Sequence, residues 1–174
     1  MRRVCVISTA SGSGKTTFGR ALAARLDVPF HELDALHHGP NWAEPTVEEF
    51  RAKVAPIVED DVWVIDGSYR GKLGDLVPEA ADTVVWLDLP LLVWLPRLVR
   101  RTTRRVVRRE ELWNGNRERL RDVFHPHNSV VVYALRNYRA QRRALAADLP
   151  RFSLVRLRSD RDIDEFLRSA GRAT

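Results

Sequence analysis

The chain has 174 residues, 44% of them hydrophobic, which is enough for one well-packed domain with a globular core. Its single cysteine, Cys5, excludes an internal disulfide; we expect neither a membrane span of roughly 18 apolar residues nor a signal peptide, and predict a cytoplasmic protein without a membrane partner. The net charge of +6 is regional, because fourteen arginines stand against four acidic residues between Arg97 and Arg143.

Short apolar strands alternate along the chain with amphipathic helices. In chain order, we predict a strand at 4–8, a helix at 15–26, a strand at 28–33, a helix at 46–58, strands at 62–66 and 83–88, helices at about 91–109 and 128–147, a strand at 152–157 and a helix at 162–170. The helix at 46–58 opens with a capping box, Thr46 with Glu49. This alternation predicts a single α/β domain, 1–174, with a parallel sheet between helical layers.

Residues 8–17, STASGSGKTT, join the first predicted strand to the first predicted helix. A glycine-containing loop in this position aims backbone amides and a helix N-terminus at one anion, while Lys15 reaches outer phosphates and the Thr16 hydroxyl binds magnesium. The predicted phosphate-binding residues are Ser11, Gly12, Ser13, Gly14, Lys15, Thr16 and Thr17. The sequence therefore predicts a phosphate-binding loop, with an ordinary Ser/Gly-rich turn as the alternative.

The motif has one departure from its pattern. In G-x-x-x-x-G-K-[ST], Gly14, Lys15 and Thr16 fit, but Thr9 stands at the first glycine position. We interpret this as a modest defect, because Gly12 and Gly14 still allow the backbone to approach a phosphate closely.

Three acidic residues end predicted strands, at the sheet edge where ligands of parallel α/β folds bind. Asp66 follows the third strand and suits a water-mediated contact to magnesium. Asp34 follows the second strand and is placed to orient or deprotonate an acceptor hydroxyl. Capping of the next helix is the alternative for both residues, and it is the role that we predict for Asp88 after the fourth strand.

The helix predicted at about 91–109 has one face made almost entirely of arginine. At 100° per residue this face holds Arg97, Arg100, Arg101, Arg104 and Arg108, beside an apolar face of Leu91, Leu95, Leu98 and Val106. Like charges at i,i+4 cost a few tenths of a kcal/mol each, and a polyphosphate lying against the face would offset that cost. A solvated basic face is the alternative.

Histidine pairs and tryptophans give weaker signals. His37-His38 and the pair at 125 and 127 have neither cysteine partners nor helical spacing, so we predict loops and no zinc site. Most tryptophans are expected to pack in the interior; Trp42 and Trp113 lie where a planar substrate would stack.

Taken together, the chain resembles the nucleoside-monophosphate-kinase-like group of P-loop kinases, and more closely the small adenylate-kinase-related proteins labelled "DNA topology modulation protein". The segments that carry this resemblance are SGSGKTT, HELDALHHGPNW, WVIDGSYRG, ADTVVWLDLP and REELWNGNRE. The narrower family is indicated by LDALHHGPNW and LWNGNRE.

The resemblance implies a three-layer P-loop NTPase fold with a five-stranded parallel sheet in order 2-3-1-4-5, a helical lid at about 91–127, ATP and Mg²⁺. It implies that Arg70, in IDGSYR, contacts an acceptor phosphate, and that Ser159 and Asp160 lie near the adenine base. Ser68-Tyr69 replaces the Phe-Pro usual in adenylate kinase, which puts AMP as acceptor in doubt.

The predicted function is transfer of the γ-phosphoryl group of ATP to a nucleotide or small hydroxylated metabolite. The transferred group is stabilised by Lys15, Arg101 and Arg104; Arg97 and Arg101 contact the nucleotide, Thr16 and Asp66 hold Mg²⁺, and Asp34, Trp42 and Arg70 hold the acceptor. The alternatives are a nucleotide-switched regulator that binds nucleic acid through the arginines, and an NTP hydrolase without a dedicated acceptor.

Overall fold

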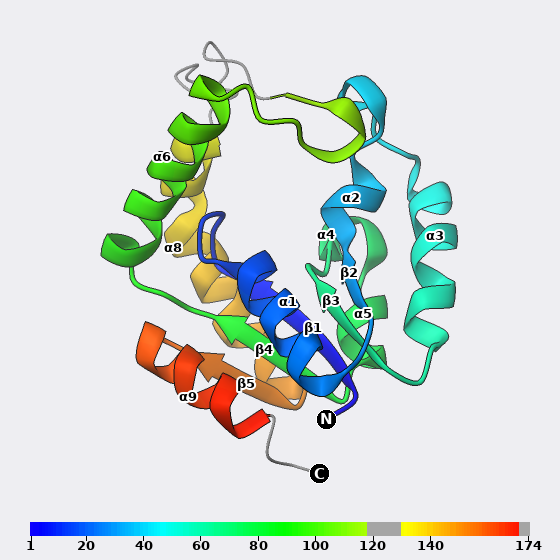
Figure 1. Ribbon diagram of the computed structural model, residues 1–174. Coiled ribbons are helices and arrows are strands. Elements are labelled where there is room, and N and C mark those ends of the chain that lie inside the picture. The colour runs from blue at the N-terminus through cyan, green and yellow to red at the C-terminus, as the bar shows by residue number, and fades with distance from the viewer. Residues whose placement is uncertain (118–129, 171–174) are drawn as a thin grey trace.

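The computed structural model describes residues 1–117 and 130–170, which form an α/β fold built on one five-stranded parallel sheet (Figure 1). The strands are β1 (Arg3–Ser8), β2 (Phe30–Glu32), β3 (Trp63–Asp66), β4 (Thr83–Leu87) and β5 (Leu154–Leu157). Their order in the sheet is β2-β3-β1-β4-β5, and all four neighbouring pairs are parallel. The predicted order 2-3-1-4-5 is thus confirmed.

The helices that the sequence predicted are present, and their described ends lie close to the predicted ones; the predicted start at 128 lies outside the described residues. They are α1 (Lys15–Leu26), α3 (Val47–Glu59), α6 (Leu91–Val107), α8 (Val130–Asp148) and α9 (Asp160–Ala170). The predicted capping box at the start of α3 is confirmed, because the backbone amide of Glu49 donates to Thr46 Oγ1 (3.1 Å) and that of Thr46 donates to Glu49 Oε2 (2.9 Å). Nowhere in the described ranges is a helix long and apolar enough to cross a bilayer.

Several short helices were not predicted. They are α2 (Leu33–His37), α4 (Arg70–Leu73), α5 (Leu76–Ala80) and the 3₁₀ turns η1 (Pro40–Trp42), η2 (Trp113–Gly115) and η3 (Leu149–Arg151). Each is too short to show a helical period in the sequence. Two of them, α2 and η2, carry residues of the site described below.

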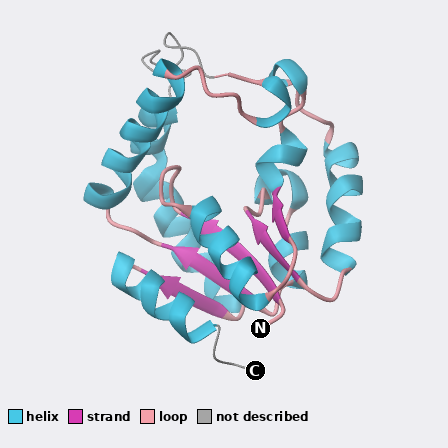
Figure 2. Cartoon of the chain, in the orientation of Figure 1, coloured by secondary structure: helices cyan, strands magenta, loops and turns pink. Residues whose placement is uncertain are grey.

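Helices cover both faces of the sheet, as the predicted layers require (Figure 2). Alternate β1 side chains point to opposite faces: Val4 and Val6 pack toward α1 and α9, whereas Cys5 and Ile7 pack toward α3 and α5. A smaller third cluster forms where α6 and α8 meet, and it includes Ala10 of the loop after β1.

Asp88 does not cap α6, so that prediction was wrong. Pro90 is the N-cap of α6, and no side chain caps the helix. The Asp88 carboxylate, with a side chain 0% exposed, instead binds the guanidinium groups of Arg142 on α8 and Arg156 on β5 through four hydrogen bonds of 2.6–3.0 Å. Burial alone would raise the pKa of Asp88, but these bonds lower it below its ordinary value.

This buried carboxylate predicts a pH-dependent contribution to stability. Because the pKa of Asp88 is lowered on folding, the stabilisation is present above the unfolded-state pKa and is lost as the pH falls through the folded-state pKa. Asp88→Asn should lower the free energy of unfolding by about 2–3 kcal/mol at neutral pH. Denaturant unfolding at several pH values should show this difference shrinking below about pH 4. The exposed Asp61→Asn is the control, and a constant difference at all pH values would contradict the assignment.

Candidate active site

The loop between β1 and α1 presents backbone amides at one end of a cavity. Its glycines Gly12 and Gly14 both have positive φ, 86° and 84°, which L side chains rarely adopt. A Cβ at Gly12 would lie 2.7 Å from the Cβ of Leu98, so the loop packs directly against α6. Gly14 is the N-cap of α1 and no side chain caps this helix, so its first amides remain available to an anion.

Polar side chains gather beside this helix start. The Lys15 ammonium lies 2.9 Å from Asp66 Oδ1, and the Thr16 hydroxyl donates to Asp66 Oδ2 (2.6 Å). Glu32 Oε1 is 3.4 Å from the same hydroxyl oxygen. These oxygen donors fit a magnesium ion, whose preferred ligands are carboxylates, hydroxyls and water.

Glu32 is a site residue that sequence reasoning missed. It lies inside the run predicted as a strand at 28–33, where a side chain usually serves packing. The pairing of β2 with β3 sets Glu32 directly opposite Asp66, and the sequence has no local signal for that pairing.

The arginine face of α6 forms one wall of a cavity of about 960 Å³ that also contains the phosphate loop. Its lining includes Arg97, Arg100, Arg101, Arg104 and Arg105. Arg108, which the helical wheel placed on this face, is not part of the lining, and Arg105 takes part instead. Most of the predicted arginine face therefore lines the same cavity as the glycine loop and the start of α1.

The cavity lining also includes acidic and aromatic side chains, Glu32, Asp34, Glu111 and Trp113. Asp34 belongs to α2, which lies across the molecule from α6 (Figure 1). The Tyr69 hydroxyl donates to Asp34 Oδ1 (2.6 Å), and burial together with Asp34 raises the pKa of Tyr69 so that its proton stays in place. Asp34 is thereby held with one carboxylate oxygen occupied and lines the cavity opposite the arginines.

Residues 112–117, which we call the strap, extend from the end of α6 toward α2 and η1 (Figure 1). The Asn114 amide donates to the carbonyl of His38 (2.5 Å), and the Asn116 amide donates to that of Gly39 (2.8 Å). Asn116 Oδ1 accepts from the backbone amide of Trp42 (2.9 Å). Sequence reasoning missed both asparagines, because their role depends on a segment more than seventy residues away.

The two tryptophans proposed for stacking behave differently. Trp113 lines the cavity and stacks on the imidazole of His38, with ring centroids 5.5 Å apart. Trp42 is 41% exposed, touches His38 edge-on and is not part of the lining. Only Trp113 is positioned to contact a molecule in the cavity.

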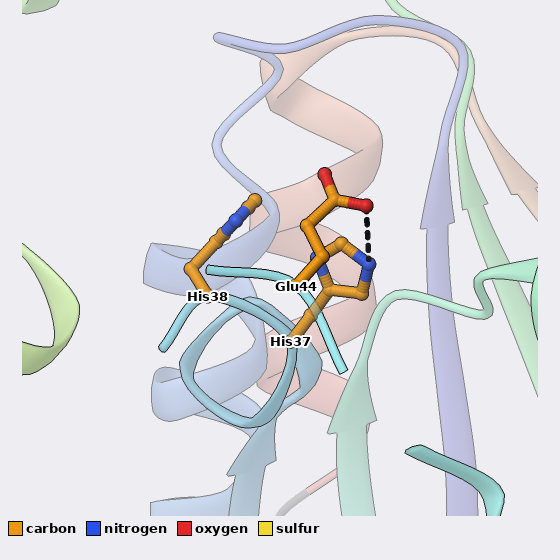
Figure 3. A group of neighbouring side chains, drawn as sticks. All are labelled: His37, His38 and Glu44. Atoms are coloured by element: carbon orange, nitrogen blue, oxygen red, sulfur yellow. Dashed lines mark ion pairs between the residues drawn. The ribbon is translucent and has the colours of Figure 1, made fainter. Parts of the chain in front are cut away.

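His37, His38 and Glu44 form a group whose possible ligand atoms all lie within 4.8 Å of one another (Figure 3). His37 lies in α2 and is buried, so the predicted loop position was wrong for this residue. The Lys72 ammonium is 2.7 Å from both His37 Nε2 and Glu44 Oε2. Burial, with Lys72 and His38, lowers the pKa of His37 and keeps its ring neutral. Because an ammonium already bridges these two atoms, we assign no metal to the group.

Arg70, predicted to hold the acceptor, is not brought to the cavity. Its guanidinium pairs with Asp75 (2.8 Å) and Asp148 (3.1 Å), and it is not part of the lining. Asp75 and Asp148 therefore take up the positive charge that an acceptor phosphate would need.

Ser159 and Asp160 also lie outside the cavity lining. Ser159 caps α9 by reciprocal hydrogen bonds with Asp162, each 3.1 Å long. Asp160 binds Arg97 of the cavity wall at 2.7 Å. The predicted adenine contact thus stays a prediction, while the ion pair links α9 to α6.

The sheet order, the glycine loop at the start of α1 and the lysine beside Asp66 define the class: the chain has the fold of P-loop kinases. Three solved structures share this fold at low sequence identity. They are shikimate kinase from Bacteroides thetaiotaomicron (TM-score 0.57, 16% identity, 97% of this chain and 95% of that one), a gluconokinase from Sinorhizobium meliloti (0.52, 21%, 97% and 89%) and shikimate kinase from Aquifex aeolicus (0.53, 17%, 96% and 95%). No protein-family model and no curated protein matches the sequence.

Proposed function

We propose that the protein is an ATP-dependent kinase that transfers the γ-phosphoryl group to a hydroxyl group of a small metabolite. The observation that carries this proposal is one cavity lined by the phosphate loop, by the arginines of α6 and by Asp34 on the opposite wall. Phosphoryl transfer depends mainly on positioning and charge neutralisation, and these are the groups that it requires.

At the donor end, we propose that the amides of 11–17 and the Lys15 ammonium bind the β- and γ-phosphates. Arg97 and Arg101 contact the nucleotide, and Arg101 and Arg104 neutralise charge on the transferred group. Thr16 and Asp66, with Glu32 beside them, would hold Mg²⁺. When bound there, Mg²⁺ would supply positive charge that offsets the negative charge of the phosphates.

At the acceptor end, we propose that Asp34 accepts the proton of the acceptor hydroxyl. The acceptor oxygen forms a bond to the γ-phosphorus, the bond from that phosphorus to the β,γ-bridging oxygen breaks, and ADP leaves with the electron pair. Tyr69 occupies one oxygen of Asp34 and orients the other. Trp113 packs against the acceptor.

The acceptor that these contacts favour is a hydroxylated metabolite rather than a nucleotide. Arg70, the residue expected to hold an acceptor phosphate, is bound by Asp75 and Asp148. We also propose the narrower relation to the proteins labelled "DNA topology modulation protein". Two segments suggested it, LDALHHGPNW and LWNGNRE, and hydrogen bonds from the strap, which lies in the second segment, connect it to the first. A reducing cytoplasmic setting suits the buried thiol of Cys5.

The nucleic-acid alternative has less support than the kinase. The arginines that suggested it, Arg100, Arg101 and Arg104, line the same cavity as the loop between β1 and α1, and this concave arrangement suits a small phosphorylated ligand better than a duplex. A hydrolase without an acceptor does not explain why Asp34 and Trp113 line the same cavity as the phosphate loop.

The test has two stages. Calorimetric titration of the full chain with Mg·ADP should show saturable heat, and ADP release from Mg·ATP should then rise with one class in a panel of sugar acids, polyols, other hydroxylated metabolites and nucleoside monophosphates. Absence of heat with Mg·ADP and Mg·ATP would overturn the proposal. ADP release that no acceptor stimulates would favour the hydrolase.

A further inference from the structure

The residue that breaks the phosphate-loop motif is deeply buried. Thr9 is 1% exposed, although it stands where the motif has its first glycine. Its backbone φ is not positive, so the chain needs no glycine at this position. A buried hydroxyl requires hydrogen-bond partners, and these partners identify what the threonine does.

The Thr9 hydroxyl acts both as a hydrogen-bond donor and as an acceptor. It donates to Asp88 Oδ1 (3.3 Å) and accepts from the indole N–H of Trp86 (3.0 Å). Trp86 and Asp88 follow one another closely at the end of β4, and both are buried. The first residue of the loop is therefore attached by its side chain to the neighbouring strand.

Asp88 extends this attachment beyond the sheet. Its carboxylate accepts two hydrogen bonds from Arg142 of α8 (2.7 and 3.0 Å) and two from Arg156 of β5 (3.0 and 2.6 Å). The Arg156 guanidinium also lies over the Trp86 ring, 4.2 Å from its centroid. In a buried network of this kind, each side chain is held in one orientation by the hydrogen bonds that it makes to the others.

The helix that Arg142 belongs to also supports the arginine wall. Ala134 of α8 packs with Leu98 of α6, and Tyr138 of α8 packs against Trp94 with ring centroids 5.4 Å apart. Leu98 is the residue that approaches Gly12 of the phosphate loop. The loop thus contacts this pair of helices twice, directly at Gly12 and through Asp88 at Thr9.

We propose that Thr9 is a positioning residue for the phosphate loop, which it ties through Asp88 to Arg142 on α8, so that nucleotide affinity depends on this helix. The inference rests on the proposed function, because it presumes that the loop binds phosphates. A glycine at this position would leave the start of the loop flexible. The Thr9 hydroxyl instead fixes it, so the loop is held in its binding conformation before a nucleotide binds.

The test is a double-mutant cycle on the full chain, with Thr9→Val and Arg142→Gln, read out as the Kd for Mg·ADP by calorimetry. Thr9→Val keeps the shape and removes the hydroxyl, and we expect about a tenfold weaker Kd. Arg142→Gln should weaken binding several-fold. The double variant should bind about as well as Thr9→Val alone, because both changes break the same connection.

Two further variants separate positioning from general stability. Thr9→Ser restores the hydroxyl and should restore the Kd, whereas Thr9→Gly restores the motif glycine and should bind as weakly as Thr9→Val. Arg143→Gln, one residue along α8 and exposed, is the matched control for Arg142. Melting temperatures identify any variant that binds weakly because it is unfolded at the assay temperature. If Thr9→Val is unfolded, the Kd values of Thr9→Ser and Thr9→Gly test the role of the hydroxyl in its place.

The outcomes are distinguishable from failure of the proposed function. If wild-type protein binds Mg·ADP and folded Thr9→Val binds it equally well, the positioning role is wrong and the kinase proposal stands. Fully additive losses in the double variant would also overturn the role, because Thr9 and Arg142 would then act separately. If wild-type protein binds no nucleotide, both proposals fall together.

Discussion

Lys15→Ala is expected to weaken binding of Mg·ADP and Mg·ATP by about 10²–10³-fold, as measured by calorimetric titration. The ammonium group belongs to the first residue of α1, directly after the loop, and backbone amides alone do not replace its charge. The ammonium lies 2.9 Å from Asp66 Oδ1, so it is held beside the position proposed for the phosphates.

The same ion pair complicates this variant and suggests its controls. Removal of Lys15 leaves the Asp66 carboxylate, 2% exposed, without its cation, which costs stability. Thermal unfolding must therefore show that Lys15→Ala is folded at the titration temperature. Lys53→Ala, an exposed lysine of α3, is the control for loss of one positive charge. A folded Lys15→Ala protein with wild-type affinity would contradict the phosphate-loop assignment.

The fold could be predicted largely because its strongest signals are local. The sequence from β1 through the glycine loop to α1 contains its own start and stop signals, and the predicted helix at 15–26 has the observed ends. Long apolar periods likewise located α3, α6, α8 and α9 to within a few residues. The short helices α2, α4 and α5 are stabilised by packing against the rest of the fold, and they are too short to produce a helical periodicity in the sequence.

The candidate site could be predicted in part. Contacts that follow from strand ends were predicted, whereas ion pairs between residues far apart in the sequence were not. Asp66 beside Thr16 followed from the rule that ligands bind where parallel strands end. By contrast, Arg70 pairs with Asp148, which is 78 residues away, and Arg97 pairs with Asp160, which is 63 residues away. No spacing rule in one sequence predicts such pairs.

The hydrogen bonds of the strap could not be predicted from the sequence either. Asn114 and Asn116 belong to REELWNGNRE, which indicated a family resemblance but no role for either asparagine, and in the fold their side-chain amides bind backbone groups of 38–42. A buried asparagine needs partners for both its amide and its carbonyl, and Asn116 has them in Gly39 and Trp42. Polar residues in a loop predict hydrogen bonds, but the fold decides which carbonyls are near.

Asp34→Asn is expected to lower the rate of acceptor phosphorylation by about 10²–10⁴-fold while leaving the Kd for Mg·ADP unchanged. The amide keeps an oxygen for the Tyr69 hydroxyl, so the side chain is expected to stay in place, but it no longer takes a proton from an acceptor. The measurement is ADP release in the presence of whichever acceptor stimulates the wild-type protein, together with calorimetry.

Tyr69→Phe makes the assignment of Asp34 sharper, because it removes the hydroxyl that orients the carboxylate and leaves the ring packed between His37 and Phe50. Its rate should fall far less than that of Asp34→Asn, since the proton acceptor is still present. If Asp34→Asn turned over at the wild-type rate, another group would have to accept the proton. If it instead lost affinity for Mg·ADP, the carboxylate would belong to the nucleotide end of the cavity, and the division into an arginine wall for phosphates and an acidic wall for the acceptor would be wrong.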